Sequence, residues 1–148
     1  MRLEIPSRIE RRWHAEARRQ WPLEAFAYVL GHRDAWGYAV EDIWIPSNSH
    51  AEASEYGIYT PRRWLHEAYR IADEEGLRVI GDVHSHPRRY RDYAGSLAEA
   101  TPSEGDYDTG WAGLCGITNA SEQRNGRIRC RTRFYAPISR INRVSKRL

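Results

Sequence analysis

Two histidines two residues apart, His84 and His86, are the side chains whose type and spacing most clearly indicate chemistry. In an extended strand, successive side chains point to opposite faces, so the two imidazoles share one face and Ser85 points to the other. A catalytic zinc site usually has three protein ligands and leaves the fourth position to water. The sequence therefore predicts half of a metal site, and a third ligand can come from Asp106.

The segment from Ser103 to Asp106 has an alternative interpretation and two competitors. A serine followed three residues later by an acid is also the pattern of a helix capping box. The two interpretations are compatible, because a helix N-terminus can turn both side chains toward the histidines. The other candidates for the third ligand are Glu99, in a rival Ser-x-x-Glu segment, and Asp108.

Glu24 begins an apolar run, residues 25–30, that reads as a buried strand ending at Gly31. Burying a carboxylate is costly unless it has a partner, and a metal-bound water is one such partner. The alternative is a carboxylate at a strand edge that faces solvent. The two histidines downstream favour the first interpretation.

Together these segments resemble the JAMM motif of the MPN/JAB metalloprotease family. The matching residues are Glu24 in its apolar run, the sequence His84-Ser85-His86-Pro87, and Ser103 with Asp106. The resemblance is to the catalytically competent, prokaryotic stand-alone type, and it covers nearly the whole chain. It implies zinc-dependent hydrolysis of amide or isopeptide bonds, often at the C-terminal tail of ubiquitin or a ubiquitin-like protein.

The resemblance also implies a role for each site residue. One Zn²⁺ per chain would be held by His84, His86 and Asp106, and Glu24 would be the general base that takes a proton from the zinc-bound water. Ser103 would help to hold the oxyanion of the tetrahedral intermediate. The fifteen residues between Pro87 and Ser103 form a longer interval than the family pattern, and Asp106 is preferred to Glu99 because its Ser-x-x-Asp spacing is intact.

The implied fold is α+β, a JAB/MPN-like three-layer arrangement similar to that of cytidine deaminase, with a mixed curved β-sheet flanked by helices. Residues 1–148 are expected to form a single JAB/MPN metalloprotease domain, with a basic tail, 138–148, that is partly flexible. Periodicity predicts helices over 8–20 and 61–75, and strands over 25–30, 37–40, 42–45, 55–59, 77–86, 111–118 and 127–136.

Several single residues are expected to set the ends of these elements. Ser7 and Thr60 are predicted to be N-caps, and Pro87 is predicted to end its strand. A turn is expected at 32–34, and Gly76 should end the second helix. His14, which lies among arginines and glutamates in the first helix, is expected to be solvated.

Composition limits the classes of function. A 148-residue chain with 41% apolar residues, six Trp and nine Tyr is expected to form a globular core. No stretch has the length of a membrane span, and the N-terminus lacks the apolar region of a secretory signal, so a cytoplasmic location is expected. Cys115 and Cys130 lack a Cys-x-x-Cys spacing and are expected to be reduced. A net charge of +3 comes without a nucleic-acid motif, so nucleic-acid binding is not favoured.

The leading functional hypothesis is an isopeptidase, a deubiquitinase-like enzyme that removes a ubiquitin-like modifier or processes its precursor. A stand-alone bacterial enzyme of this kind resembles those encoded beside ubiquitin-like conjugation systems, including antiphage operons. The activating and conjugating enzymes of such an operon would be the partners of this protein. The alternatives are a sulfur-carrier-protein hydrolase, a phage tail peptidase, and a non-catalytic MPN scaffold. The segment Arg88 to Tyr93, at the start of the long 88–102 insert, is a candidate substrate-gripping loop.

Overall fold

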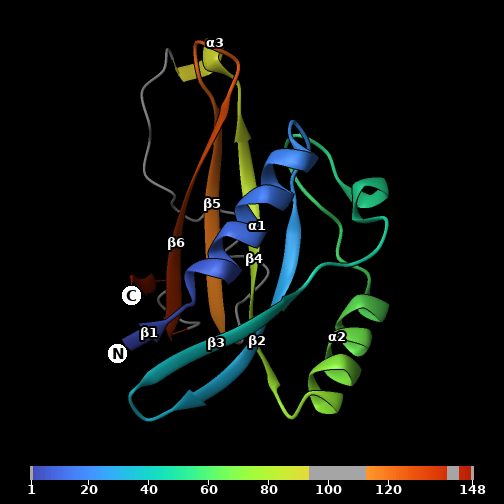
Figure 1. The fold of residues 1–148 in the computed structure, drawn as a ribbon, viewed down its shortest axis with the longest axis vertical. Helices are drawn as coiled ribbons and strands as arrows, with labels where there is room; N and C mark the ends of the chain where they lie inside the picture. Colours follow the sequence, from blue (N-terminus) through green and yellow to red (C-terminus); the bar gives the residue numbers. More distant parts are fainter. Residues whose placement is uncertain (1, 94–112, 140–143, 148) are drawn as a thin grey trace.

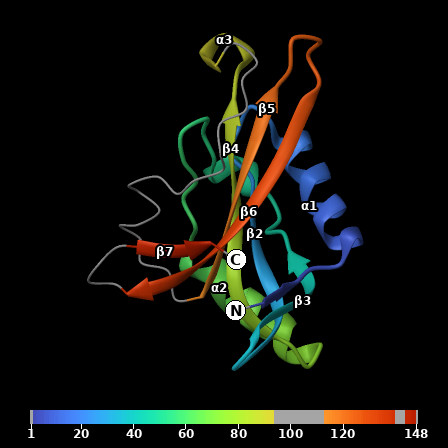
Figure 2. The ribbon, with the colours of Figure 1, turned by 90° about the vertical axis from the view of Figure 1, so that its left-hand side faces the viewer.

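A computed structural model describes residues 2–93, 113–139 and 144–147 of the chain. In this part of the chain, the strands form one sheet with helices on both sides (Figure 1, Figure 2). The strands are β1 (Arg2–Glu4), β2 (Phe26–Asp34), β3 (Gly37–Trp44), β4 (Arg78–Arg88), β5 (Leu114–Glu122), β6 (Ile128–Ser139) and β7 (Val144–Arg147). The helices are α1 (Ser7–Gln20), α2 (Arg62–Glu74), the four-residue α3 (Tyr90–Tyr93) and the 3-10 helix η1 (Ser49–Glu52).

The sheet is mixed, as predicted. Its strand order is β1-β3-β2-β4-β5-β6-β7. β4 runs parallel to β5, and β1 runs parallel to β3, whereas the other neighbouring pairs are antiparallel. The central strands β2 and β4 are covered from both sides, which confirms the expected α+β class and its three layers.

Helix α1 covers one face of the sheet, where it contacts β3, β5 and β6. Its apolar residues recur every four positions, so they form one stripe along the helix. Ile9, Trp13 and Ala17 are accordingly buried against the sheet. The Trp13 indole Nε1–H also donates a 2.7 Å hydrogen bond to Thr118 Oγ1 on β5, which fixes the position of the helix on this face.

His14 takes part in the same contact, and the expectation that it is solvated is wrong. Its side chain is only 14% exposed. His14 Nε2 lies 2.8 Å from Thr132 Oγ1, which in turn lies 2.6 Å from Thr118 Oγ1. Burial lowers the pKa of His14, because desolvation penalises the imidazolium form.

Helix α2 covers the opposite face, where it contacts β2 and β4. Trp64, Ala68 and Ala72 face the sheet, and the Trp64 ring stacks on Phe26 with 6.2 Å between ring centroids. Along β2, alternate residues therefore face α1 and α2. This two-sided burial explains why the run beginning at residue 25 is continuously apolar.

Strand β4 continues through Pro87, so the prediction that Pro87 ends the strand is wrong. Pro87 pairs with Ala120, and Arg88 pairs with Ser121, on β5. Proline interrupts a sheet only where its missing N–H would have had a partner. The Ser85 amide donates to Ala25 beside β2, and backbone groups alternate in direction along a strand, so the nitrogen of Pro87, two residues later, points to the same side, beyond the last hydrogen bond between β4 and this segment. The strand therefore loses no hydrogen bond at the proline.

Other boundaries also differ from the predictions. β2 continues beyond Gly31 to Asp34, where a turn was expected, and β3 is one strand where two were predicted. β2 and β3 pass very close at Gly31, since a Cβ there would lie 2.0 Å from the carbonyl oxygen of Ala39. The predicted strand at 55–59 is reduced to an isolated bridge between Ala53 and Ile58.

The helix and strand ends follow the same pattern of small shifts. Pro6 and Pro61 occupy the N-cap positions, in place of Ser7 and Thr60, and neither helix has a side-chain cap hydrogen bond. Gly76 follows α2 with φ at +69°, as expected for a glycine that ends a helix. β5 extends to Glu122, so the turn before β6 is shorter than predicted.

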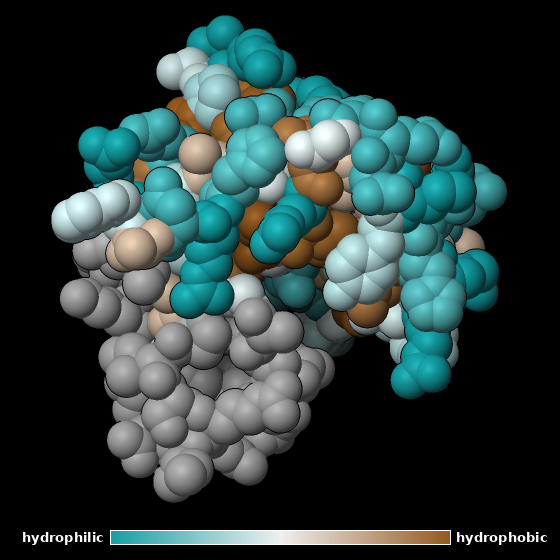
Figure 3. Space-filling view, turned by 90° about the horizontal axis from the view of Figure 1, so that it is seen from below, coloured by the Kyte–Doolittle hydropathy of each residue, from teal (hydrophilic) through white to brown (hydrophobic). Residues whose placement is uncertain are grey.

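The remaining expectations concern the tail, the thiols and the surface. Val144–Arg147 of the basic tail forms β7, which pairs with β6. Cys115 and Cys130 form no disulfide with any described residue, in agreement with the expected reduced state. Figure 3 shows hydrophilic residues over most of one face, with apolar residues gathered in a central hollow. Among the described residues, no helix combines the length and the apolar character that crossing a bilayer requires.

Candidate metal centre

The pairing of β2 with β4 brings Glu24 to the two histidines. Phe26 is paired with His84 across the antiparallel ladder, so their side chains share a face of the sheet. Glu24 lies two residues before Phe26, and His86 lies two residues after His84, so both continue on that face. Residues about sixty positions apart in the sequence thus meet at one end of the β2–β4 pair.

The three side chains converge on one point. One ligand atom from each of Glu24, His84 and His86 lies within 4.8 Å of the others. Glu24 is buried, with 5% of its surface exposed, as the sequence predicted for an acid with a partner. The prediction that the two imidazoles share a face is confirmed.

The spacing of the imidazole nitrogens fits a zinc ion. Nε2 of His84 and Nε2 of His86 lie 3.1 Å apart. Two nitrogens bound to one tetrahedral zinc would be about 3.3 Å apart, given bonds of about 2.0–2.1 Å. In a direct hydrogen bond one ring must donate, whereas a metal uses a lone pair from each ring. The two imidazole nitrogens are therefore suitably placed to bind one zinc ion. A third protein ligand must come from another residue.

Ser85 holds the two segments of the site together from the opposite face. It is fully buried, and its Oγ accepts a 2.8 Å hydrogen bond from the backbone amide of Ala25. The Ser85 amide donates to the Ala25 carbonyl at 3.0 Å. These two bonds extend the β2–β4 pairing by one residue and fix the backbone next to Glu24.

The segment between β3 and α2 forms a cover beside Glu24. The Glu24 amide donates a 2.8 Å hydrogen bond to the carbonyl of Ser54. A Cβ at Gly57 would lie 3.6 Å from Glu24 Oε2, so this segment runs directly against the carboxylate. Tyr56 and Tyr59 of the same segment are 94% and 67% exposed, which leaves two aromatic rings available for contact with a ligand.

Two further residues beside His84 were missed by the sequence analysis. One ligand atom from each of Asp82, His84 and Cys115 lies within 4.8 Å of the others. Asp82 has a signal in the sequence, because it lies two residues before His84 and must share its face. Cys115 has none, since only the parallel pairing of Asp82 with Cys115 places it there.

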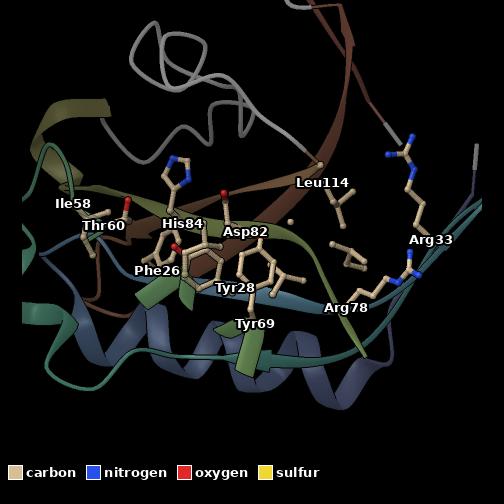
Figure 4. A pocket seen from close by; sticks show the side chains of 15 residues that line it. Phe26, Tyr28, Arg33, Ile58, Thr60, Tyr69, Arg78, Asp82, His84 and Leu114 are labelled. Atoms are coloured by element: carbon tan, nitrogen blue, oxygen red, sulfur yellow. The ribbon is translucent and has the colours of Figure 1, made fainter. Parts of the chain in front are cut away.

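A groove with a volume of about 570 Å³ leads away from His84 between β4 and α2. Figure 4 shows His84 toward one end of this groove, with Asp82 beside it. Two arginines, Arg33 and Arg78, lie at the opposite end. Phe26, Tyr28, Leu65 and Tyr69 are among the residues that line it. Burial, with the nearby Asp82 charge as a second cause, raises the pKa of Tyr28 to about 12, so its hydroxyl stays protonated at neutral pH.

The start of the long insert packs against the cover segment. The guanidinium of Arg89 forms an ion pair with the carboxylate of Glu55 and lies over the ring of Trp21. The hydrogen bond from Arg89 stabilises the carboxylate of Glu55 and so lowers the pKa of Glu55. The Tyr90 amide donates a 3.0 Å hydrogen bond to Glu122 Oε1. Arg89 thus links the end of β4 to the segment that lies over Glu24.

The predicted oxyanion donor and third ligand lie outside the described residues. This applies to Ser103 and Asp106 and equally to the alternatives Glu99 and Asp108. Gly113 and Leu114, which follow this part of the chain, line the same groove and lie next to Ile80 and Gly81 of β4. The assignments of Ser103 and Asp106 stay predictions.

Solved structures of low sequence identity share this fold. A solution structure from Desulfitobacterium hafniense has a TM-score of 0.70 at 17% identity, covering 99% of this chain and 90% of that one. A solution structure from Salinibacter ruber has a TM-score of 0.61 at 20% identity, covering 100% and 88%. The crystal structure of a JAB1/MPN domain protein from Archaeoglobus fulgidus has a TM-score of 0.53 at 17% identity, covering 100% and 94%.

The family assignment follows from the sequence. No curated protein matches the chain. The profile of the prokaryotic homologues of the JAB domain matches residues 6–129, a range that includes Glu24, both histidines, Ser103 and Asp106. With the fold likeness to a JAB1/MPN domain protein and the convergence of Glu24 with the histidines, this match confirms the predicted family. The chain belongs to the prokaryotic JAB-domain family.

Proposed function

We propose that this protein is a zinc-dependent hydrolase that cleaves the amide bond after the C-terminal tail of a ubiquitin-like modifier. The bond would be an isopeptide bond to a lysine or the peptide bond of a precursor. The observation that carries the proposal is the convergence of a buried carboxylate, Glu24, with the imidazoles of His84 and His86. Family membership supports it, because the JAB family includes zinc isopeptidases.

His84 and His86 would hold the zinc ion through their Nε2 atoms, with Asp106 as the third protein ligand. When bound, zinc acts as a Lewis acid that polarises the carbonyl under attack and lowers the pKa of water toward about 7. Both histidines must be neutral to bind the ion. The strand geometry already directs their nitrogens to one point, so binding requires little rearrangement of β4.

Glu24 would be the general base. Its carboxylate would accept a proton from the attacking water and later deliver it to the departing amine nitrogen, which must leave as a neutral group. The burial of Glu24 beside Gly57 shields that transfer from bulk solvent. The hydroxyl of Ser103 would donate to the oxyanion that forms on the substrate carbonyl.

The groove beside His84 supports an extended peptide as the substrate. Arg78 and His84 are six positions apart on β4, which is about 20 Å at the rise of a strand. An extended tail of five or six residues matches that length, and it could pair its apolar parts with Phe26 and Leu65. A ubiquitin-like modifier has a tail of this kind, which would place its terminal carbonyl next to the histidines.

Two other enzyme functions and one non-enzymatic function compete with this proposal. A sulfur-carrier-protein hydrolase or a phage tail peptidase would use the same site on another tail. A non-catalytic scaffold would have no need to retain Glu24 with both histidines, so the convergence of all three favours an enzyme. Activating and conjugating enzymes of a bacterial ubiquitin-like or antiphage operon would be the partners.

The test combines metal analysis with a panel of substrates. Purified protein should contain about one zinc per chain by inductively coupled plasma mass spectrometry. It should also cleave ubiquitin-like proteins with a Gly-Gly terminus that are fused through a peptide or isopeptide bond. Glu24→Gln should keep the zinc and lose cleavage. Zinc-loaded protein that cleaves no member of the panel would contradict the proposal, and loss of zinc from Glu24→Gln would contradict the role of Glu24 as base.

A further inference from the structure

Asp82 occupies a distinctive position with respect to His84. The two residues are two positions apart on β4, so their side chains project from the same face (Figure 4). At least one carboxylate oxygen of Asp82 lies within 4.8 Å of a ring nitrogen of His84. Both residues line the groove, so the carboxylate is part of the site and not of the outer surface.

The order of residues along β4 determines which edge of the His84 ring faces which neighbour. Asp82, His84 and His86 follow one another on a single face, about 6.6 Å apart. His84 therefore lies between the other two. Its Nε2 faces Nε2 of His86 at 3.1 Å. The Nδ1–H bond of an imidazole points away from the direction of Nε2, so Nδ1 is on the edge directed away from His86, and Asp82 is the neighbour of His84 on that side along β4.

We propose that Asp82 is a positioning residue that accepts a hydrogen bond from Nδ1–H of His84. This bond would hold the neutral imidazole in the tautomer that places its lone pair on Nε2, the atom that faces His86. Histidines that bind metals commonly donate their second nitrogen to a carboxylate, which fixes the ring and increases its basicity as a ligand. The inference rests on the proposed zinc site, to which it adds a residue that does not touch the metal.

The neighbours of Asp82 are consistent with this role. Tyr28 is paired with Asp82 across the β2–β4 ladder, and Cys115 is paired with it across the β4–β5 ladder. Both flank the carboxylate, and Cys115 is 1% exposed. A thiol is a weak acceptor, so of the two groups beside His84 the carboxylate is the better partner for an imidazole N–H.

The tautomer of His84 provides a test that does not depend on zinc. Two-dimensional ¹H–¹⁵N NMR of the metal-free full chain should show His84 protonated at Nδ1 in the unmodified protein. Asp82→Ala should lose this preference. Cys115→Ala, which alters the same neighbourhood without removing the carboxylate, should retain it. Asp82→Asn keeps an acceptor oxygen and should restore much of the Nδ1–H form, which a merely structural role would not predict.

Zinc affinity, measured by competition with a chromophoric chelator, gives the second readout. Asp82→Ala should raise the zinc Kd by about 10- to 100-fold. Asp82→Asn should raise it less, and Cys115→Ala should leave it nearly unchanged. Circular dichroism melting checks that each variant is folded. If Asp82→Ala does not fold, Asp82→Asn alone carries the test, with a small loss of the Nδ1–H form and a small rise in the zinc Kd as the expected results.

Three outcomes would overturn the proposed role of Asp82, and a fourth would overturn only the proposed function. An unchanged His84 tautomer in Asp82→Ala would exclude the hydrogen bond. Complete loss of zinc from Asp82→Ala would make Asp82 a ligand, and equal losses from Asp82→Ala and Cys115→Ala would indicate a metal held by Asp82, His84 and Cys115. If the unmodified protein bound no zinc but Asp82→Ala still changed the tautomer, the proposed function would fail and the role of Asp82 would stand.

Discussion

The Oγ of Ser85 accepts a 2.8 Å hydrogen bond from the backbone amide of Ala25, the residue next to Glu24. Ser85 lies between the two histidines but points to the opposite face of β4, where it is fully buried. One three-residue stretch of β4 thus presents two candidate ligands on one face and fixes the position of the candidate base from the other. The relative placement of Glu24 and the histidines depends on this contact.

Replacing Ser85 by Ala should impair both stability and catalysis. The Ala25 amide would lose its side-chain acceptor in a buried position, which costs about 1–3 kcal/mol in the free energy of unfolding. Because Glu24 would be held less precisely, kcat should fall by roughly tenfold or more while zinc content stays constant. Urea unfolding and steady-state kinetics measure the two effects.

Ser121→Ala is the matched control for that experiment. Ser121 is also fully buried, but its Oγ has no hydrogen-bond partner among the described residues. Removing this hydroxyl should therefore leave the free energy of unfolding within about 0.5 kcal/mol of that of the unmodified protein or raise it. Equal losses in the two variants would show that the bond from Ala25 has no special role.

The third zinc ligand can be identified by metal content. Asp106→Ala should reduce bound zinc from about one per chain to near zero, because two imidazoles alone hold the ion weakly. Glu99→Ala and Asp108→Ala should retain it. Inductively coupled plasma mass spectrometry after gel filtration gives the measurement. Retention of zinc by Asp106→Ala together with its loss from Glu99→Ala would establish the rival Ser-x-x-Glu assignment.

Tyr69 should contribute to substrate binding without contributing to chemistry. Its ring lines the groove and is 53% exposed, so a bound peptide could cover it. Tyr69→Ala should raise KM by about 5- to 30-fold with kcat nearly unchanged, equivalent to a loss of about 1–2 kcal/mol of binding. Trp36 is 78% exposed and does not line this groove, so Trp36→Ala is the control. A fall in kcat alone would argue against a binding role for Tyr69.

The buried His14 should make stability depend on pH. Its folded-state pKa is lowered by burial, so below about pH 6.5 the unfolded chain binds the proton more readily than the folded one. The stability that neutral His14 contributes is therefore fully present above its pKa in the unfolded chain. It is lost as the pH falls through its lower pKa in the folded protein. His14→Gln, which can still hydrogen-bond Thr132, should flatten the dependence of Tm on pH between about 7.5 and 5. Parallel curves for the two proteins would contradict this assignment.

Local sequence was sufficient for the features that depend on strand and helix periodicity. His84 and His86 share a face because side chains alternate along any strand, whatever packs around it. Ile9, Trp13 and Ala17 form one buried stripe for the equivalent reason in a helix. Glu24 could be singled out because a carboxylate at the start of an apolar run needs a partner. These inferences required no knowledge of which segments pair.

Tertiary structure decided the features that depend on pairing between distant segments. Pro87 lies within β4 because the pairing with the β2 segment ends at Ser85, and that register is set by the whole ladder. His14 is buried because Thr132, 118 residues away, lies beneath α1. Cys115 approaches His84 only through the parallel pairing of β4 with β5. Periodicity fixes which way a side chain points from its own backbone, but long-range register determines what it meets there.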